Sequence, residues 1–135
     1  MSVMSNVEAP AERGRDAPGL RTKGQIEAEI SKAMIRFKRE QLGRGPADIR
    51  TQILQDLVIV RMADMLTPAD RSLVRAGGVD LLKQVRTKLL ESERETLHRM
   101  LREATGCEVA TIYSDLCSRT GEQLIVFVLR QSPEV

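Results

Sequence analysis

The segment Leu124-Ile125-Val126-Phe127-Val128-Leu129 decides the fold, because it is apolar on both faces of an extended chain. A strand of this kind belongs in the centre of a sheet, and we expect both of its faces to be covered. The polar loop Ser118–Glu122 precedes it, and the strand-like segment Glu108–Cys117 precedes the loop. Together, Glu108–Cys117 and Gln123–Arg130 predict a β-hairpin.

A second pair of strands is predicted earlier in the chain. The segments Ile49–Leu54 and Leu57–Met65 are rich in apolar and β-branched residues, and Gln55-Asp56 separates them. This pattern also predicts a β-hairpin. The chain therefore supplies its strands as two hairpins.

The first helix is predicted to begin after Thr22 and to end at Gly43. Thr22 and Gln25 fit a capping box, in which each side chain accepts a hydrogen bond from the backbone amide of the other residue. Gly43 suits the left-handed conformation that commonly ends a helix. One apolar stripe recurs between them at helical spacing and consists of Ile26, Ile30, Ala33, Met34 and Phe37.

Two further helices are predicted between the hairpins. Thr67 and Pro68 start a short helix, which Gly77-Gly78 interrupts. Asp80 then caps a helix that runs to Thr105 and spans about 40 Å, at roughly 1.5 Å per residue. Its buried stripe is predicted to consist of Leu82, Val85, Leu89, Leu97, Met100, Leu101 and Ala104.

The element order α-β-β-α-α-β-β predicts an α+β fold, with an antiparallel four-stranded sheet from two hairpins and helices packed on one face. Residues 22–131 are predicted to form a single domain. Residues 1–21 are interpreted as a disordered N-terminal tail from their proline, glycine and charge content, with a tether to a partner as the alternative. One chain of this size leaves the other face of the sheet open, so we expect a second copy to cover it in a homodimer.

The composition narrows the classes of function. The chain has 135 residues, a net charge of +2, and Phe37, Tyr113 and Phe127 as its aromatic residues. So few aromatic faces and so little positive charge predict no nucleic-acid binding. No bilayer-length apolar segment and no signal peptide is recognisable, so we expect a cytoplasmic protein without direct membrane insertion. Cys107 and Cys117 are predicted to stay reduced, since one strand would hold them roughly 30 Å apart.

The corner Gly43-Arg44-Gly45-Pro46 is the first candidate site. Its glycines and proline are what a helix end and a change of direction require. Arg44 remains, and its planar guanidinium can bind a carboxylate or a phosphate. Either it ties the corner to a carboxylate of the protein itself, for example Asp48 or Asp56, or it faces a bound ligand beside Gly45.

The second hairpin carries the other candidate site. Turn chemistry alone explains its loop, with Gly121 in the left-handed position. The alternative is a polar cluster that binds a small ion or a partner protein. The residues of this candidate site are Asp115, Arg119, Thr120, Gly121 and Glu122.

His98 is the single histidine of the chain. It lies four residues from both Arg94 and Arg102, opposite the apolar stripe, so we interpret it as a solvated surface residue. The sequence contains neither metal-ligand spacings such as CxxC or HExxH nor the GxGxxG, P-loop and GxSxG motifs. No catalytic residue, metal site or cofactor is therefore predicted, and the chain is not expected to be an enzyme.

Three stretches of the chain resemble a known bacterial family. They are the corner LGRGP (Leu42–Pro46), the helix start LTPAD (Leu66–Asp70) and the segment TGCEVATIYSDLCSRTGEQLIVFVL (Thr105–Leu129). The resemblance covers about Lys23–Leu129 and is to the MpsC family, which is labelled as part of a sodium-translocating, membrane-potential-generating system. Ser114 stands where the family usually has threonine and keeps the hydroxyl. The family name implies a link to bicarbonate or cation supply at the membrane.

Two main functional hypotheses follow. The first is a soluble, non-enzymatic accessory or regulatory module that binds a partner protein or a small ligand, with the homodimer expected from the open sheet face. The resemblance implies a membrane transport protein as its partner. The alternative is a small-molecule sensor that holds an anion or a nucleotide with Arg44 and Arg119. An enzyme is the third hypothesis, and it would require ionisable side chains that converge in one deep pocket.

Overall fold

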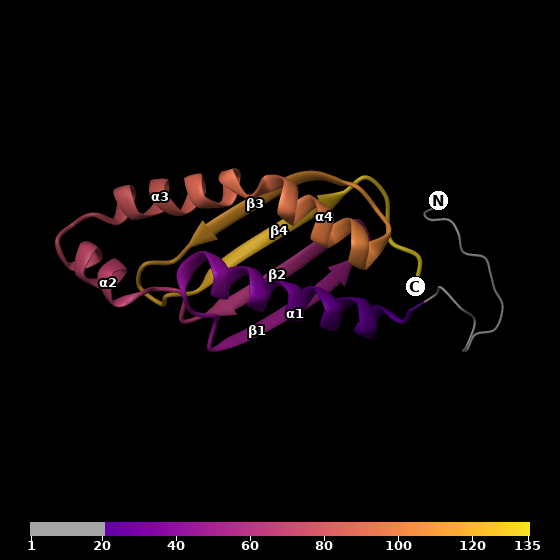
Figure 1. Ribbon diagram of the computed structural model, residues 1–135, viewed down its shortest axis with the longest axis horizontal. Coiled ribbons are helices and arrows are strands. Elements are labelled where there is room, and N and C mark those ends of the chain that lie inside the picture. The colour runs from indigo at the N-terminus through magenta and orange to yellow at the C-terminus, as the bar shows by residue number, and fades with distance from the viewer. Residues whose placement is uncertain (1–20) are drawn as a thin grey trace.

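The computed structural model describes residues 21–135 of the chain (Figure 1). Its elements in chain order are α1 (Lys23–Leu42), β1 (Asp48–Leu54), β2 (Leu57–Ala63), α2 (Pro68–Arg75), α3 (Val79–Ser92), α4 (Arg94–Thr105), β3 (Val109–Leu116) and β4 (Gln123–Leu129). The predicted tail, residues 1–21, lies outside the described residues except for Arg21. The Arg21 guanidinium forms an ion pair with Glu29 and donates a hydrogen bond to Ala104 O at 2.6 Å.

The strands form one antiparallel sheet in the order β1-β2-β4-β3. Each predicted hairpin pairs its own two strands, and the pairing of β2 with β4 joins the hairpins, with Val58 opposite Phe127. The apolar strand β4 is therefore central, as predicted. The α+β fold class and the two-hairpin sheet are confirmed.

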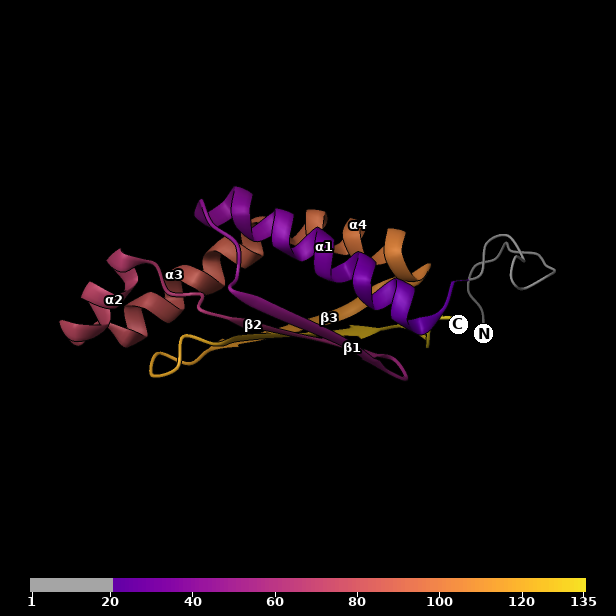
Figure 2. The same ribbon diagram turned by 90° about the horizontal axis from the view of Figure 1, so that it is seen from below.

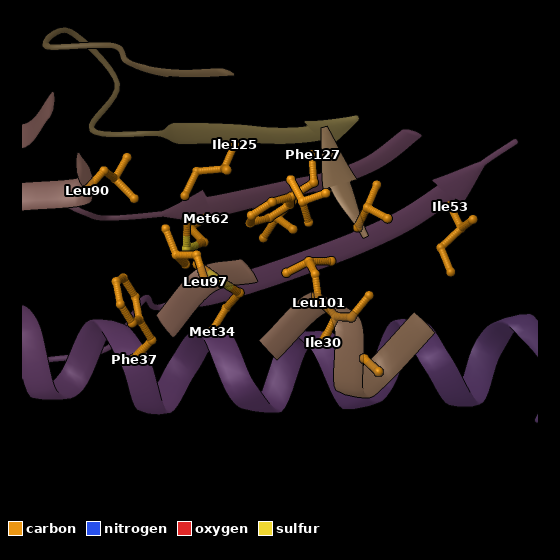
Figure 3. Close-up of a cluster of buried hydrophobic side chains, with 14 of the residues drawn as sticks. Ile30, Met34, Phe37, Ile53, Met62, Leu90, Leu97, Leu101, Ile125 and Phe127 are labelled. Carbon is orange, nitrogen blue, oxygen red and sulfur yellow. The ribbon is translucent and has the colours of Figure 1, made fainter. Parts of the chain in front are cut away.

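The core lies between the sheet and the helices on one of its sides. Figure 2 shows α1 and α4 over the strands and α2 beyond one end of the sheet. Figure 3 shows side chains of the helices and of β2 and β4 pointing toward one another. Among those labelled are Ile30, Met34, Phe37, Leu97 and Leu101 of α1 and α4, and Met62, Ile125 and Phe127 of β2 and β4. Each fully buried aliphatic or aromatic side chain of this kind contributes about 1.5–3 kcal/mol to folding.

Both ends of α1 follow from local sequence. The Thr22 hydroxyl accepts from Gln25 N at 3.1 Å, and the Gln25 side chain accepts from Thr22 N at 2.8 Å, which completes the predicted capping box. Gly43 ends the helix with φ 79°, and its amide donates to Arg39 O at 2.9 Å. The chain can then turn toward β1.

The predicted single helix over residues 80–105 is wrong, because α3 and α4 are separate helices that meet at Glu93. The Ser92 hydroxyl donates to Leu89 O at 2.7 Å beside this break, and such local hydrogen bonds compete with helix continuation. A straight helix of about 40 Å would also exceed the sheet, since a strand of eight residues spans about 26 Å. The bend lets α4 run over the sheet beside α1 (Figure 1).

The predicted cap and stripe of this region also need correction. Gly78 rather than Asp80 occupies the position before α3. Val85 is 47% exposed, although it was assigned to the buried stripe, because α3 turns a different side toward the sheet. The buried residues of α3 are Leu82, Arg86 and Leu90, and those of α4 are Leu97, Leu101, Ala104 and Thr105.

The second face of the sheet is not covered by the described residues (Figure 2). Cross-strand partners share a face, so Leu57 lies beside Val128, and Ile59 lies beside Val126. The apolar residues of this open face are Leu54, Leu57, Ile59, Tyr113, Leu124, Val126 and Val128. Leu54 and Tyr113 are 57% and 61% exposed, and the residues of β2 and β4 between them are half-buried or exposed.

We expect Gly43→Ala to lower the free energy of unfolding by about 1 kcal/mol, because an L-residue is strained at positive φ. No atom of a non-adjacent residue lies within 4 Å of the added methyl group, so any loss of stability comes from the strained backbone conformation alone. Gly24→Ala is the matched control, since Gly24 also faces open space but lies in the first turn of α1 at an ordinary φ. It should leave stability unchanged or raise it by up to about 1 kcal/mol. Urea unfolding that shows equal losses for both variants would contradict the left-handed helix end.

Candidate functional site

Arg44 is engaged by the protein itself. Its Nη2 donates to Asp64 Oδ2 at 2.7 Å, and its Nη1 donates to Leu66 O at 3.0 Å. The carboxylate is therefore neither Asp48 nor Asp56, the two examples considered from the sequence. Arg44 therefore links the corner after α1 to the segment that follows β2. We call these hydrogen bonds of Arg44 to Asp64 and Leu66 the brace.

Asp64 is the centre of this brace. It has an unusual φ of 60°, and its second oxygen accepts from Arg71 Nη2 at 2.8 Å. Hydrogen bonding by Arg44, followed by the charge of Arg44 and the interactions of Arg71, holds the pKa of Asp64 below its usual value. The carboxylate is thus kept ionised between two arginines.

The two predicted sites lie next to each other, because the segment Asp64–Leu66 contacts both. Met65 N donates to Gly121 O at 2.8 Å, and Gly121 adopts φ 78°. Arg61, at the end of β2, donates from Nε and Nη2 to Glu122 Oε2 at 3.0 and 2.8 Å. The corner at Arg44 and the loop at Gly121 are therefore parts of one end of the sheet.

The remaining residues of the second site do not converge on one point. Asp115 Oδ1 lies 3.1 Å from Lys83 Nζ and accepts from Leu116 N, and this backbone bond, then Lys83, lowers the Asp115 pKa. The Thr120 hydroxyl accepts from Glu122 N at 3.2 Å. Arg119 is exposed. Within residues 21–135, no group of three or more histidine, cysteine or acidic side chains is arranged to hold a metal ion.

Both cysteines are free, as predicted. Cys107 is buried, and burial raises the pKa of its thiol. Cys117 is exposed in the loop, where hydrogen bonds from Thr120 and the backbone lower the pKa of its thiol.

A buried pair of cations lies inside the same end of the molecule, and sequence interpretation missed it. The Arg86 side chain is 6% exposed; its Nη2 donates to Met65 O and, at 2.7 Å, to Asp70 Oδ2. Lys38 is 1% exposed, and burial together with the charge of Arg86 lowers its pKa to about 7. One signal was available, because Arg86 lies four residues from both Leu82 and Leu90 on the inner side of α3.

Two buried polar atoms beside this pair have no hydrogen-bond partner among the described residues. They are Arg86 Nη1 and Gln123 Oε1, while Gln123 Nε2 donates to Ser114 Oγ at 3.2 Å. Arg86, Gln123 and Ser114 line a common cavity of about 20 Å³. That volume suits a single water molecule, which can accept from the arginine and donate to the amide oxygen.

A larger groove of about 490 Å³ lies where α3 bends into α4 and faces β3. Leu90, Leu97 and Ile112 line it with apolar groups, and Arg94 and His98 are among its polar residues. His98 is partly buried there rather than fully solvated. The bend at Glu93 forms this groove, so a prediction of one continuous helix could not reveal it.

The chain matches the family described as "Na+-translocating membrane potential-generating system (MpsC)" over residues 22–131. The chain belongs to the MpsC family. It is also 40% identical, over 110 residues, to the uncharacterized protein YbcI of Bacillus subtilis (strain 168), an alignment that covers 81% of this chain and 89% of YbcI. No solved structure matches the chain. The resemblance stated from the LGRGP, LTPAD and SD…TGE segments is therefore confirmed.

The family's description names a membrane process. Among residues 21–135 of this MpsC member, no helix combines the length and the apolar character needed to cross a bilayer. The three stretches that carry the resemblance meet at the end of the sheet described above, through Arg44, Leu66 and Gly121.

We expect Arg44→Lys to lower the free energy of unfolding by about 1 kcal/mol, because one ammonium cannot make both hydrogen bonds of the guanidinium. Arg50→Lys is the matched control, since Arg50 is exposed and lies 3.5 Å from Asp48 in a looser pair. Its stability should be unchanged. Chemical unfolding checks both variants. Wild-type stability in Arg44→Lys would show that the brace contributes nothing to folding.

We expect Lys38→Met to stabilise the protein at pH 6 and to flatten the dependence of its stability on pH between 7 and 10. The folded pKa of about 7 lies below the ordinary value of 10.5, so in this range the unfolded chain holds a proton that the folded chain releases. Unfolding free energy therefore rises with pH, by at most about 1.4 kcal/mol per unit from this group. Lys32→Met, on the exposed side of α1, is the control. The free energy of unfolding is measured with urea at each pH. If it changes with pH equally in Lys38→Met and in wild type, the buried position of Lys38 is contradicted.

Proposed function

We propose that this MpsC member is a non-catalytic accessory module that acts as a homodimer beside a membrane ion-transport system. The observation that carries the proposal is the open face of the sheet. Apolar side chains are exposed on that face, which supports contact with another protein, and four pairs of ionisable groups at the candidate sites are used in contacts within the protein. Those contacts are Arg44–Asp64, Arg61–Glu122, Lys83–Asp115 and Arg86–Asp70.

The centre of the open face is aliphatic, and polar residues of β1 and β3 surround it. Ile59 and Val126 are direct neighbours at its centre, and Tyr113 continues the row on β3. Antiparallel sheets commonly leave one face in water, but such a face is then lined by polar residues. Here the central strands β2 and β4 present aliphatic side chains instead, which favours coverage by another protein surface.

A second copy of the chain is the occupant that suits this face. Two sheets can pack face to face at about 10 Å, with the side chains of each inner face interdigitating. An isologous contact requires the same patch on both partners, and an aliphatic patch complements itself. At the end of the patch, the pair Arg61–Glu122 supplies charges of both signs, which a two-fold axis can match.

The link to ion transport rests on the family's description. YbcI, the similar protein of Bacillus subtilis, is described as uncharacterized and adds nothing to this point. We therefore propose the transport system as the setting in which the dimer works, and the cytoplasm as its location. The hypothesis of an anion sensor at Arg44 is less well supported, because the Arg44 guanidinium already binds Asp64 and Leu66 O.

Val126→Glu should halve the mass of the assembly in analytical ultracentrifugation, because it places a charge at the centre of the open face. Ala28→Glu is the matched control, since Ala28 is exposed on α1 in the helical layer. Leu54→Glu is a second test on the same face, because Leu54 is 57% exposed and the new carboxylate is not buried in the folded monomer. Circular dichroism verifies that each variant folds. An unchanged mass in both open-face variants would contradict the face-to-face dimer.

The same variants test the accessory role in cells. In a strain that lacks the gene, wild type and Ala28→Glu should restore the membrane potential measured with a voltage-sensitive dye in sodium medium. Val126→Glu should not restore it. If the deletion leaves the potential unchanged, the transport setting is wrong even when the dimer exists.

A further inference from the structure

Among the described residues, helical side chains cover the β1 edge of the sheet but not the β3 edge. On the β1 edge, the Glu27 carboxylate of α1 accepts a hydrogen bond from Ile53 N at 2.8 Å. The hydroxyls of Ser31 and Thr51 form another link between α1 and β1 at 2.8 Å. Side chains of α1 therefore cover this edge and occupy its backbone, which is one of the ways in which proteins protect a sheet edge.

The β3 edge has no such cover in the part of the chain that the structure describes. The groove of about 490 Å³ separates it from α3 and α4 along residues 110–114. Those five residues are consecutive, although strand side chains alternate between faces, so the backbone edge itself forms a wall of the groove. No helical side chain is hydrogen-bonded to this stretch of backbone. The strand also contains neither proline nor lysine, the residues that commonly blunt an exposed edge.

The outer side of α3 carries an apolar stripe that the fold leaves uncovered. Leu81 and Val85 are 53% and 47% exposed, and Leu89, four residues further on, is half-buried. This spacing places them on one side of the helix. The buried residues Leu82 and Leu90 lie further around the helix, so the apolar surface of α3 extends from the side that faces the sheet to a side that the fold leaves exposed.

The stripe and the edge belong to one surface. Thr87 and Glu91 line both the groove beside β3 and the hollow beside the stripe of α3. Figure 1 shows α3 and β3 along the same long side of the molecule, with β1 along the opposite side. We call this surface the lateral side; it consists of the β3 edge, residues 110–114, and the α3 stripe Leu81, Val85 and Leu89.

The lateral side carries side-chain charges of both signs. The side chains of Lys88, Glu91 and Arg94 form no ion pair or hydrogen bond with any described residue, whereas Lys83 beside the stripe pairs with Asp115. Glu91 and Arg94 both line the groove, and Lys88 lies beside the stripe. A surface that carries both signs can match its own charges across a two-fold axis, since each acid then meets a base of the other copy.

We propose that the lateral side is a second self-association surface, on which another copy of this chain docks by its own lateral side. The two-fold contact sets the β3 edges next to each other and packs the α3 stripes together. A second copy meets all three features at once, because it brings a strand edge, an apolar helix and both signs of charge. The contact differs from the open face, with which it shares Tyr113: the lateral contact uses the backbone edge of β3 and the α3 stripe, and the open face uses side chains of the strands. Two different two-fold contacts on one chain generate a tetramer when their axes cross at right angles, and that is the arrangement we propose.

Val85→Glu tests the lateral contact without disturbing the core, because Val85 is already half exposed. Sedimentation velocity should give a tetramer for wild type and Ala28→Glu, and half that mass for Val85→Glu. Val126→Glu should also give half the mass, and the double variant should give the monomer. A wild-type mass that Val85→Glu leaves unchanged overturns the lateral contact. If Val85→Glu halves the mass and Val126→Glu has no effect, the lateral contact stands and the open-face dimer of the proposed function fails.

Hydrogen exchange gives a second readout at the edge itself. In wild type, amides within residues 110–114 should exchange at least about tenfold more slowly than in Val85→Glu, because an adjacent strand protects them. Amides of β1 should exchange equally in both, since the open-face contact is intact. Equal exchange of residues 110–114 in the two proteins overturns the pairing of the β3 edges.

Discussion

A four-stranded sheet has two faces and two edges, and the helices of this chain cover one face and one edge. This constraint organises the rest of the molecule. The covered face holds the core, with Met34 of α1 and Leu97 of α4 packed toward Phe127 (Figure 3). The covered edge is β1, where Glu27 accepts from the backbone. We propose the uncovered face and the β3 edge as the surfaces that bind other copies of the chain, because apolar side chains and strand edges are stabilised by burial and pairing.

The two buried cations, Lys38 and Arg86, make an unfavourable contribution to folding at one end of the core. Both occupy positions on the inner sides of their helices, and Asp70 forms an ion pair with Arg86. Burying a charge is unfavourable unless hydrogen bonds compensate for lost water. Arg86 finds this compensation in Asp70 and Met65 O, whereas Lys38 responds by a lowered pKa. The arginine thereby ties α3 to the start of α2.

One short segment, Asp64–Leu66, holds the family motifs close to one another. Asp64–Leu66 accepts both hydrogen bonds of Arg44 and donates from Met65 N to Gly121 O. Thr67, the next residue, caps α2 together with Asp70. The corner after α1, the start of α2 and the loop between β3 and β4 are thus joined at one end of the sheet. The spacing of these residues along the chain does not predict that they are close in space, since the contacts join residues from three separate elements.

The sequence by itself determined the features that depend on neighbouring residues. The Thr22 cap, the helix end at Gly43 and the two hairpins all follow from local conformational preference and apolar periodicity. The tertiary structure alone decided that α3 and α4 separate at Glu93, that Asp64 is the partner of Arg44, and that Arg86 is buried. These outcomes depend on the size of the sheet and on contacts between residues far apart in the chain. Such contacts arise from packing in three dimensions, and local sequence patterns do not encode them.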